Sequence, residues 1–186
     1  MTGGGHASSA TGRWQIVPFS EELATGVVDL ILGIQRGEFG MQITAEQQPD
    51  LARIPGFYQV GNGNFWAAVS GETIVGTIAL LDIGSSRAAL RKMFVHREFR
   101  GAEFGVATGL LDTALAWSAD RRLREIFLGT TAHFHAAHRF YEKNGFLEIP
   151  RAALPDAFPV MEVDSRFYRR AIRPAARSER PSESGV

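Results

Sequence analysis

Residues 92–107 read KMFVHREFRGAEFGVA: an apolar strand ends near Val95, a turn containing Arg100 and Gly101 follows, and an amphipathic helix begins near Gly105. The N-terminus of a helix offers unpaired backbone N–H groups and the positive end of the helix dipole, which together bind anions. The two glycines have no Cβ, so a phosphate could approach the backbone closely there, and Arg100 adds a positive charge. An ordinary connection between a strand and a helix would have the same spacing, so this stretch alone leaves two interpretations open.

A second segment, residues 136–146, reads AAHRFYEKNGF and is typical of an amphipathic helix that Gly145 ends. Tyr141 in this segment could be a core aromatic residue whose hydroxyl finds a partner. Taken alone, the segment requires no function to explain it.

Outward from these two segments, the apolar periodicity predicts alternating strands and helices. We expect strands at residues 14–19, 65–69, 73–81, 88–95, 125–129 and 160–168, and helices at residues 21–35, 105–120 and 135–144, with a short helix opened at Pro49-Asp50 and closed at Pro55-Gly56. An early hairpin and a later crossover helix imply an α/β (α+β) fold with a single mixed, mostly antiparallel central sheet flanked by helices.

The composition is that of one globular domain. The chain has 186 residues, with 20 basic and 20 acidic side chains and no cysteine. Residues 1–12 and 174–186 are poor in large apolar side chains and are expected to be disordered tails around a folded body at 13–173. The lack of cysteine excludes disulfides, thiolate zinc sites and an acyl-enzyme on a cysteine.

The charge balance also limits the expected partners. A formal net charge of zero removes the bulk attraction on which non-specific nucleic-acid or anionic-membrane binding relies. The most apolar stretch, residues 26–34, contains Asp29 and is too short to span a membrane, and no secretory signal pattern is present. We therefore expect a cytoplasmic protein that binds neither nucleic acid nor membrane.

Together, and in this order, the two segments resemble the GNAT superfamily of acetyl-CoA-dependent N-acetyltransferases, over about residues 65–146. The second segment matches the family pattern fully as Phe140-Tyr141-Glu142-Lys143-Asn144-Gly145-Phe146. The first follows the signature Arg/Gln-x-x-Gly-x-Gly/Ala at Arg100 and Gly105 but has Glu103 where the family usually has its first glycine.

The resemblance implies a GNAT-like fold, acetyl-CoA as cosubstrate, no metal, and specific roles for these residues. The backbone of Phe94 and Val95 would pair with the pantetheine arm like an added strand, and Tyr141 would protonate the departing thiolate. A carboxylate at Glu103 would repel the pyrophosphate unless it points to solvent. The pyrophosphate would be wrapped by Arg100, Gly101, Ala102, Glu103, Phe104, Gly105, Val106 and Ala107.

The implied chemistry is direct acetyl transfer to a primary amine in a ternary complex. The amine must lose a proton, because an alkyl ammonium of pKa about 10 is mostly protonated at neutral pH. The tetrahedral oxyanion needs a donor, for which the backbone N–H near Val95 is the candidate. The acceptor would be a small molecule or a peptide, in a pocket shaped by residues 34–60. The general base stays open among Glu38, Asp82, His96 and Glu98.

Two other functions remain open at this stage. A GNAT-like module could bind or sense acyl-CoA without transferring, and Glu103 is the sequence feature that favours it. Alternatively, His133, His135 and His138 could hold a metal and serve a hydrolase, since histidines at i and i+3 of a helix share a face. Residues 160–164 alternate apolar and acidic side chains, so they could form an edge strand that pairs with a second subunit in a homodimer.

Overall fold

The computed structural model describes residues 14–173, which group into two compact units. Unit 1 contains the chain up to Leu81 together with Leu90–Ala114, and unit 2 contains Asp82–Ala89 and the chain from Leu115 onward. The tails predicted at residues 1–12 and 174–186 lie outside the described residues. Among the helices between residues 14 and 173, none has both the length and the apolar character needed to cross a membrane.

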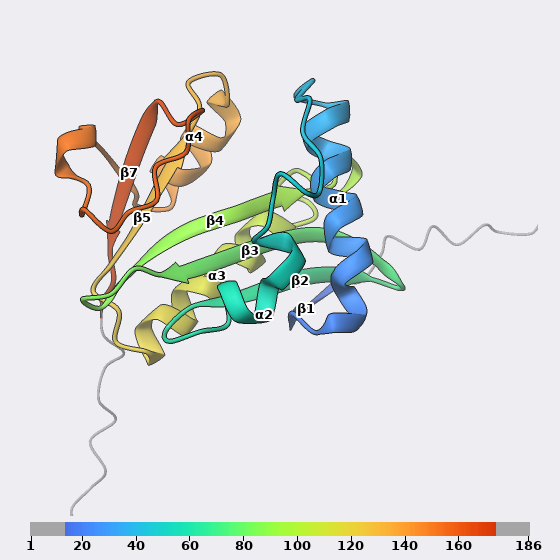
Figure 1. Cartoon of the computed structure of the whole chain (residues 1–186), viewed down its shortest axis with the longest axis horizontal. Coiled ribbons are helices and arrows are strands. Elements are labelled where there is room, and N and C mark those ends of the chain that lie inside the picture. The colour runs from blue at the N-terminus through green and yellow to red at the C-terminus, as the bar shows by residue number, and fades with distance from the viewer. Residues whose placement is uncertain (1–13, 174–186) are drawn as a thin grey trace, which may run out of the picture. The chain divides into compact units, whose positions relative to one another are not determined.

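The strands form one mixed sheet in the order β1-β2-β3-β4-β5-β7-β6 (Figure 1). This sheet, flanked by helices, confirms the predicted fold class. The strands are β1 (Trp14–Pro18), β2 (Asn64–Ser70), β3 (Thr73–Asp82), β4 (Arg87–Val95), β5 (Glu125–Thr130), β6 (Leu147–Ile149) and β7 (Arg166–Ala171), and the helices are α1 (Ala24–Gly37), α2 (Ile54–Phe57), α3 (Val106–Asp120) and α4 (His135–Lys143).

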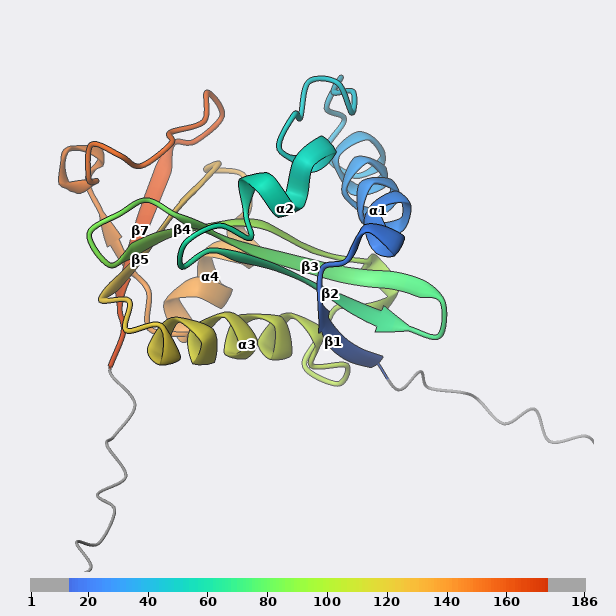
Figure 2. The same ribbon diagram turned by 60° about the horizontal axis from the view of Figure 1, so that its bottom comes forward.

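In unit 1, helices cover both faces of the strands. Figure 2 shows α1 and α2 above β2 and β3, and α3 below them. The upper face holds an apolar core of buried side chains, against which Phe94 of β4 also packs. On the lower face the chain is close-packed around two glycines: a Cβ on Gly76 would lie 2.8 Å from Leu110 Cδ1, and one on Gly109 would lie 2.6 Å from Trp14. The start of α3 is therefore held close to β3 and β1.

In unit 2, β7 pairs antiparallel with both β5 and β6, while residues 87–89 of β4 pair in parallel with β5. The predicted closing strand at 160–168 was therefore wrong in position. Residues 160–164 form a turn in which the Asp164 N–H donates to Met161 O, and the strand begins at Arg166. Since β7 lies between two strands, it is not the edge that the homodimer hypothesis required, and the short β6 was missed.

Two helix predictions had different outcomes. The short helix does not close at Pro55-Gly56, because α2 includes both residues and is preceded by a 3-10 turn at Leu51–Arg53. Proline is tolerated in the first turn of a helix because its missing N–H would be unpaired there. The stop at Gly145 is confirmed: its φ of +79° is the left-handed conformation that glycine adopts after the last turn of a helix.

Candidate functional site

The predicted anion loop lies in unit 1, between the end of β4 and the start of α3. A 3-10 turn at Arg97–Phe99 leads into it. Gly101 and Gly105 have φ values of +107° and +67°, a region that glycine enters without steric cost. The Gly105 N–H donates to Gly101 O at 3.3 Å, so the two glycines close the loop immediately before the helix.

Backbone N–H groups of this loop are unpaired. The N–H groups of residues 102–104 and 106–108 have no hydrogen-bond acceptor among the described residues. The first N–H of α3 that has one is that of Gly109, which donates to Gly105 O at 2.9 Å. The loop is fixed from outside by Trp14, whose Nε1 donates to Phe104 O at 2.7 Å. Unpaired N–H groups at the N-terminus of a long helix, next to glycines, fit a pyrophosphate.

Arg100 has neighbours that its sequence position did not predict. Its Nη1 and Nη2 donate to the two carboxylate oxygens of Glu38 at 2.7 and 2.8 Å, and its Nε donates to Val95 O at 2.8 Å. A guanidinium has five N–H donors, so one N–H on each Nη is left by these bonds. The side chain of Arg100 is 43% exposed, so those donors can reach a phosphate.

Glu103 is exposed, and its carboxylate folds back over the loop. A Cβ built on Gly101 would lie 2.6 Å from the Glu103 Cδ, so the carboxylate covers the side of Gly101 from which a Cβ would project. The negative charge therefore lies over one of the two glycines of the loop.

The end of β4 presents the backbone that the resemblance assigns to the pantetheine arm. The His96 N–H donates to Val75 O of β3 at 2.8 Å. Because alternate residues of a strand direct their N–H groups to opposite sides, the Val95 N–H points away from β3. The parallel pairing of β4 with β5 covers Arg87, Ala88 and Ala89, which leaves the later residues of β4 outside that ladder.

The four candidate bases have different surroundings. Glu38 has both carboxylate oxygens bonded to Arg100, and Asp82 accepts from the Gly84 N–H at 2.8 Å in a turn. His96 caps the 3-10 turn by accepting from the Glu98 N–H at Nδ1, 3.4 Å away, and Glu98 itself is exposed. The engaged carboxylates of Glu38 and Asp82 are poor candidates.

Tyr141 lies on α4 in unit 2, with its ring packed edge-on against Phe146. Burial raises the pKa of its hydroxyl above the ordinary tyrosine value, so the group is a neutral phenol at physiological pH. Its hydroxyl has no hydrogen-bond partner among the described residues. In this part of the chain, every fully buried side-chain N or O atom does have a partner, so the Tyr141 hydroxyl is not fully buried. The hydroxyl therefore keeps contact with solvent and is free to donate.

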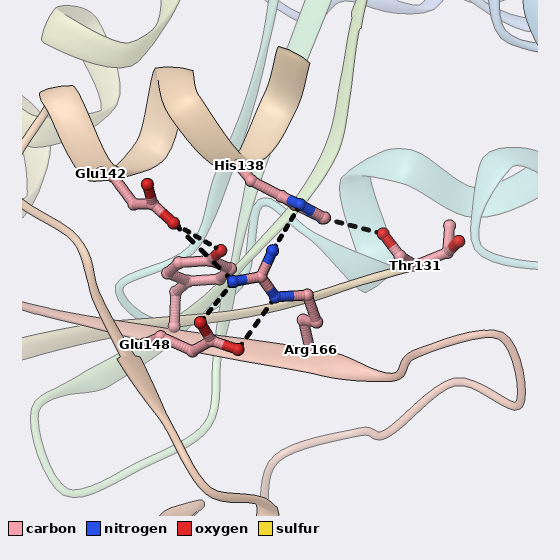
Figure 3. Close-up of polar contacts among 6 residues, drawn as sticks. Thr131, His138, Glu142, Glu148 and Arg166 are labelled. Atoms are coloured by element: carbon pink, nitrogen blue, oxygen red, sulfur yellow. Dashed lines mark hydrogen bonds and ion pairs between the residues drawn. The ribbon is translucent and has the colours of Figure 1, made fainter. Parts of the chain in front are cut away.

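The helix that carries Tyr141 is fixed to β6 and β7 by a polar cluster around Arg166 (Figure 3). The Arg166 guanidinium contacts Glu148 through Nε at 2.9 Å and also through Nη2, and its Nη1 lies 2.7 Å from Nδ1 of His138. The other ring nitrogen of His138 donates to Thr131 O at 2.9 Å. Glu142 of α4 accepts from the Tyr168 hydroxyl at 3.0 Å.

The same contacts bear on the metal hypothesis. A carbonyl oxygen only accepts, so Nε2 of His138 carries the proton and Nδ1 accepts from Arg166. His138 then has no ring nitrogen left for a metal, and no group of three His, Cys, Asp or Glu side chains within residues 14–173 has the arrangement of a metal site. The three-histidine hypothesis therefore loses one of its three ligands, His138.

Sequence reasoning missed a buried polar cluster in unit 1. Lys92 Nζ lies 3.1 Å from Asp50 Oδ2 and donates to Gln48 at 2.7 Å, and the Tyr58 hydroxyl donates to Asp50 at 2.5 Å. Burial alone would raise the pKa of Asp50, but the Lys92 ammonium and the Tyr58 hydrogen bond outweigh it and lower that pKa. Burial lowers the pKa of Lys92. The sequence signal that could have indicated this cluster is Lys92 itself, which lies between the apolar residues Leu90 and Phe94 on the same face of a strand.

A cavity of about 510 Å³ lies elsewhere, in unit 2. Leu115, Leu147 and Arg169 are among its lining residues, and none of the predicted site residues lines it. The size of a cavity does not by itself indicate chemistry, and the unpaired backbone groups of the loop at 100–107 carry more information on function.

Known proteins similar to this chain include acetyltransferases. N-acetylaspartate synthetase from Danio rerio is 33% identical over 102 residues, which are 54% of this chain and 36% of that protein. A probable N-acetyltransferase family 8 member 5 from Mus musculus is 31% identical over 104 residues, 53% of this chain and 45% of that protein. The chain thus spans less than half the length of these curated relatives.

Solved structures similar to this chain align with more of its length than the curated relatives do. An acetyltransferase of the GNAT family from Staphylococcus aureus Mu50 superposes with a TM-score of 0.82 at 35% identity, covering 87% of this chain and all of that one (100%). The paiA N-acetyltransferase of Thermoplasma acidophilum, solved in complex with coenzyme A, shares the fold with a TM-score of 0.65 at 16% identity, covering 86% of this chain and 99% of that one.

The sequence model of the acetyltransferase (GNAT) family matches residues 30–146, which include the anion loop, the end of β4 and Tyr141. This match covers more than half of the chain, and it agrees with the sheet order and with the Staphylococcus aureus structure. The chain belongs to the acetyltransferase (GNAT) family.

Proposed function

We propose that this protein is an N-acetyltransferase that moves an acetyl group from acetyl-CoA to a primary amine, directly within a ternary complex. The observation that carries the proposal is the loop at 100–107, where unpaired backbone N–H groups and two positive-φ glycines precede α3. These groups would hold the pyrophosphate, with Arg100 adding donors from the side. Acetyl-CoA supplies an activated thioester.

The chain's own residues would then divide three tasks. The backbone of Phe94 and Val95 would align the pantetheine arm by strand addition, and the Val95 N–H would donate to the carbonyl oxygen as charge develops on it. The amine nitrogen forms the new C–N bond while the C–S bond breaks. Tyr141, held neutral by its raised pKa, would give its proton to the leaving sulfur.

The proton that the amine loses needs an acceptor. Of the four candidates, His96 directly follows Val95, and its Nε2 has no hydrogen-bond partner among residues 14–173. We propose that His96, directly or through a water molecule, accepts this proton in preference to the engaged carboxylates of Glu38 and Asp82. His96→Gln should therefore lower kcat for amine acetylation without changing the affinity for acetyl-CoA.

Turnover is the test of the proposal. Purified protein is incubated with acetyl-CoA and an amine panel, and free thiol release is measured beside acetylated product. Because similar chains include an N-acetylaspartate synthetase, the panel starts with amino acids, aspartate among them, and continues with small amines and peptides. Thiol release that depends on the amine supports the transferase. Acetyl-CoA binding without turnover on any acceptor would favour the binding-only module. The Glu103 carboxylate over Gly101 is the structural feature that supports this alternative.

A further inference from the structure

The buried cluster of unit 1 connects the segment before β2 to the middle of β4. Lys92 and Asp50 have side chains only 8% and 9% exposed. Gln48 accepts from Lys92 and donates through Nε2 to Gln35 of α1 at 2.9 Å. Tyr58 completes the cluster through its bond to Asp50. Every member thus has a partner within the cluster, and Lys92 is its only member from β4.

The backbone of Lys92 is in an uncommon conformation. Its φ is +52°, although it lies inside β4. A side chain with a Cβ disfavours this left-handed region, which glycine enters freely. The Thr77 hydroxyl of β3 donates to Lys92 O at 2.7 Å, so the neighbouring strand accommodates the irregularity. The other described non-glycine residues with positive φ, namely Ser85, Ser86 and Arg122, lie outside strands.

The irregularity and the proposed cofactor strand are close together in the chain. Lys92 precedes Phe94 by two residues, so its φ affects the direction of the last residues of β4, which lie outside the ladder with β5. A strand in which residue 92 returned to an extended φ would redirect both the Lys92 side chain and the backbone after it. The ammonium would then leave Asp50, and a buried carboxylate without its partner is strongly unfavourable.

We propose that Lys92 is a positioning residue for acyl-CoA: its ammonium, anchored by Asp50 and Gln48, holds β4 in the irregular conformation that presents the backbone of Phe94 and Val95. This inference rests on the proposed function, because it concerns the strand that receives the pantetheine arm. It makes Asp50, on a different segment of unit 1, a determinant of acetyl-CoA affinity. Strain of this kind persists where the surroundings fix it and is concentrated at functional sites.

Two double variants separate the backbone conformation from the side-chain anchor. Both carry Asp50→Asn, so that no carboxylate is left buried without a partner. Lys92→Ala/Asp50→Asn removes the anchor and keeps the Cβ that disfavours a positive φ. Lys92→Gly/Asp50→Asn also removes the anchor, but glycine retains the positive φ without strain. A matched control is Arg122→Gly, which places glycine at another positive φ, +57°, in unit 2.

The readouts are the acetyl-CoA dissociation constant from calorimetry and the melting temperature. We expect the alanine variant to bind acetyl-CoA at least about 10-fold more weakly, and the glycine variant to stay within about 3-fold of wild type, while both lose thermal stability. In turnover assays the alanine variant should raise KM for acetyl-CoA and also lower kcat, because the Val95 N–H is the proposed donor to the oxyanion, whereas the glycine variant should keep both close to wild type. Arg122→Gly should bind as wild type does.

Several results would overturn the inference. Equal affinities in both double variants, whether unchanged or lowered in step with the melting temperature, would make the cluster a stability element only. If wild type itself does not bind acetyl-CoA, the proposed function fails and this inference fails with it. Should the alanine variant not fold, Lys92→Met/Asp50→Asn fills the buried volume without an anchor, and the same weakening is expected.

Discussion

Arg100 and Glu38 form a bidentate ion pair, in which Arg100 Nη1 lies 2.7 Å from Glu38 Oε2 and Arg100 Nη2 lies 2.8 Å from Glu38 Oε1. The pair joins the residue after α1 to the first residue of the anion loop, 62 positions further along the chain. It uses the carboxylate that sequence reasoning considered as a general base, and it directs the guanidinium that the resemblance assigns to the pyrophosphate.

Glu38→Gln should leave catalysis close to wild type. The carboxylate is engaged by Arg100, so its loss removes no proton acceptor, and kcat should stay within about 3-fold with an unchanged pH profile. An exposed pair contributes at most about 1 kcal/mol to the free energy of unfolding, so the melting temperature should change little. Glu72→Gln, on an exposed turn, is the matched control. A loss of two orders of magnitude in kcat would make Glu38 the base.

Glu103→Gln should tighten acetyl-CoA binding. The carboxylate lies over Gly101, where its charge would repel a pyrophosphate bound at the loop. We expect the dissociation constant to fall about 3- to 10-fold at low salt, and the gain to shrink as salt screens the charge. Titration calorimetry at two salt concentrations measures this, again with Glu72→Gln as control. Weaker binding by the variant would show that Glu103 assists the cofactor.

Tyr141→Phe should lower kcat without weakening acetyl-CoA binding. The substitution keeps the buried ring and removes a hydroxyl that has no hydrogen-bond partner among residues 14–173, so stability should be nearly unchanged. We expect kcat to fall about 10²-fold or more, as for a general acid. Because the raised pKa keeps the phenol neutral, the loss should be constant from about pH 6 to 9.

Tyr168→Phe is the control for that experiment. It removes a hydroxyl of the same unit that does have a partner, Glu142 at 3.0 Å. The expected pattern is the reverse, a modest loss of stability of about 1 kcal/mol with kcat retained. If both variants have equal kcat, the assignment of Tyr141 as acid is wrong.

Gly76→Ala should destabilise unit 1. A Cβ there would lie 2.8 Å from Leu110 Cδ1, 3.0 Å from Val106 Cγ1 and 3.3 Å from Phe94 O. Overpacking of this kind typically costs about 1–3 kcal/mol of unfolding free energy, measured by urea denaturation. Gly33→Ala on α1 meets nothing within 4 Å and should instead stabilise by about 0.5–1 kcal/mol. Similar effects at both positions would contradict the close packing of α3.

The stability of the protein should fall in acid partly through Asp50. Its pKa is lowered in the folded protein, so its contribution is fully present above its unfolded value near 3.9 and is lost as the pH falls toward the folded value. The difference in unfolding free energy between wild type and Asp50→Asn should therefore shrink as the pH drops from about 5 to 3. Chemical denaturation across that range tests it, and a constant difference would show that Asp50 is not ionised in the fold.

Much of the fold followed from local patterns. The hairpin of β2 and β3, the long helix α3 and the stop at Gly145 each depend on residues adjacent in the chain, namely alternation, helical spacing and a positive-φ glycine. The closing strand was misplaced because residues 160–164 and 166–171 both read as extended, and only the second finds hydrogen-bond partners in β5 and β6.

The sequence by itself determined the glycine-containing loop that we propose binds the cofactor, the helix that carries Tyr141 and the family to which the chain belongs, because these depend on short runs of residues with fixed spacing. Only the tertiary structure decided which groups surround them. Glu38 contacts Arg100, and Asp50 contacts Lys92, although each pair is far apart in the sequence. The local periodicity of a sequence does not predict contacts of this kind. The charge around the loop at 100–107 and the conformation of β4 are thus properties of the folded chain.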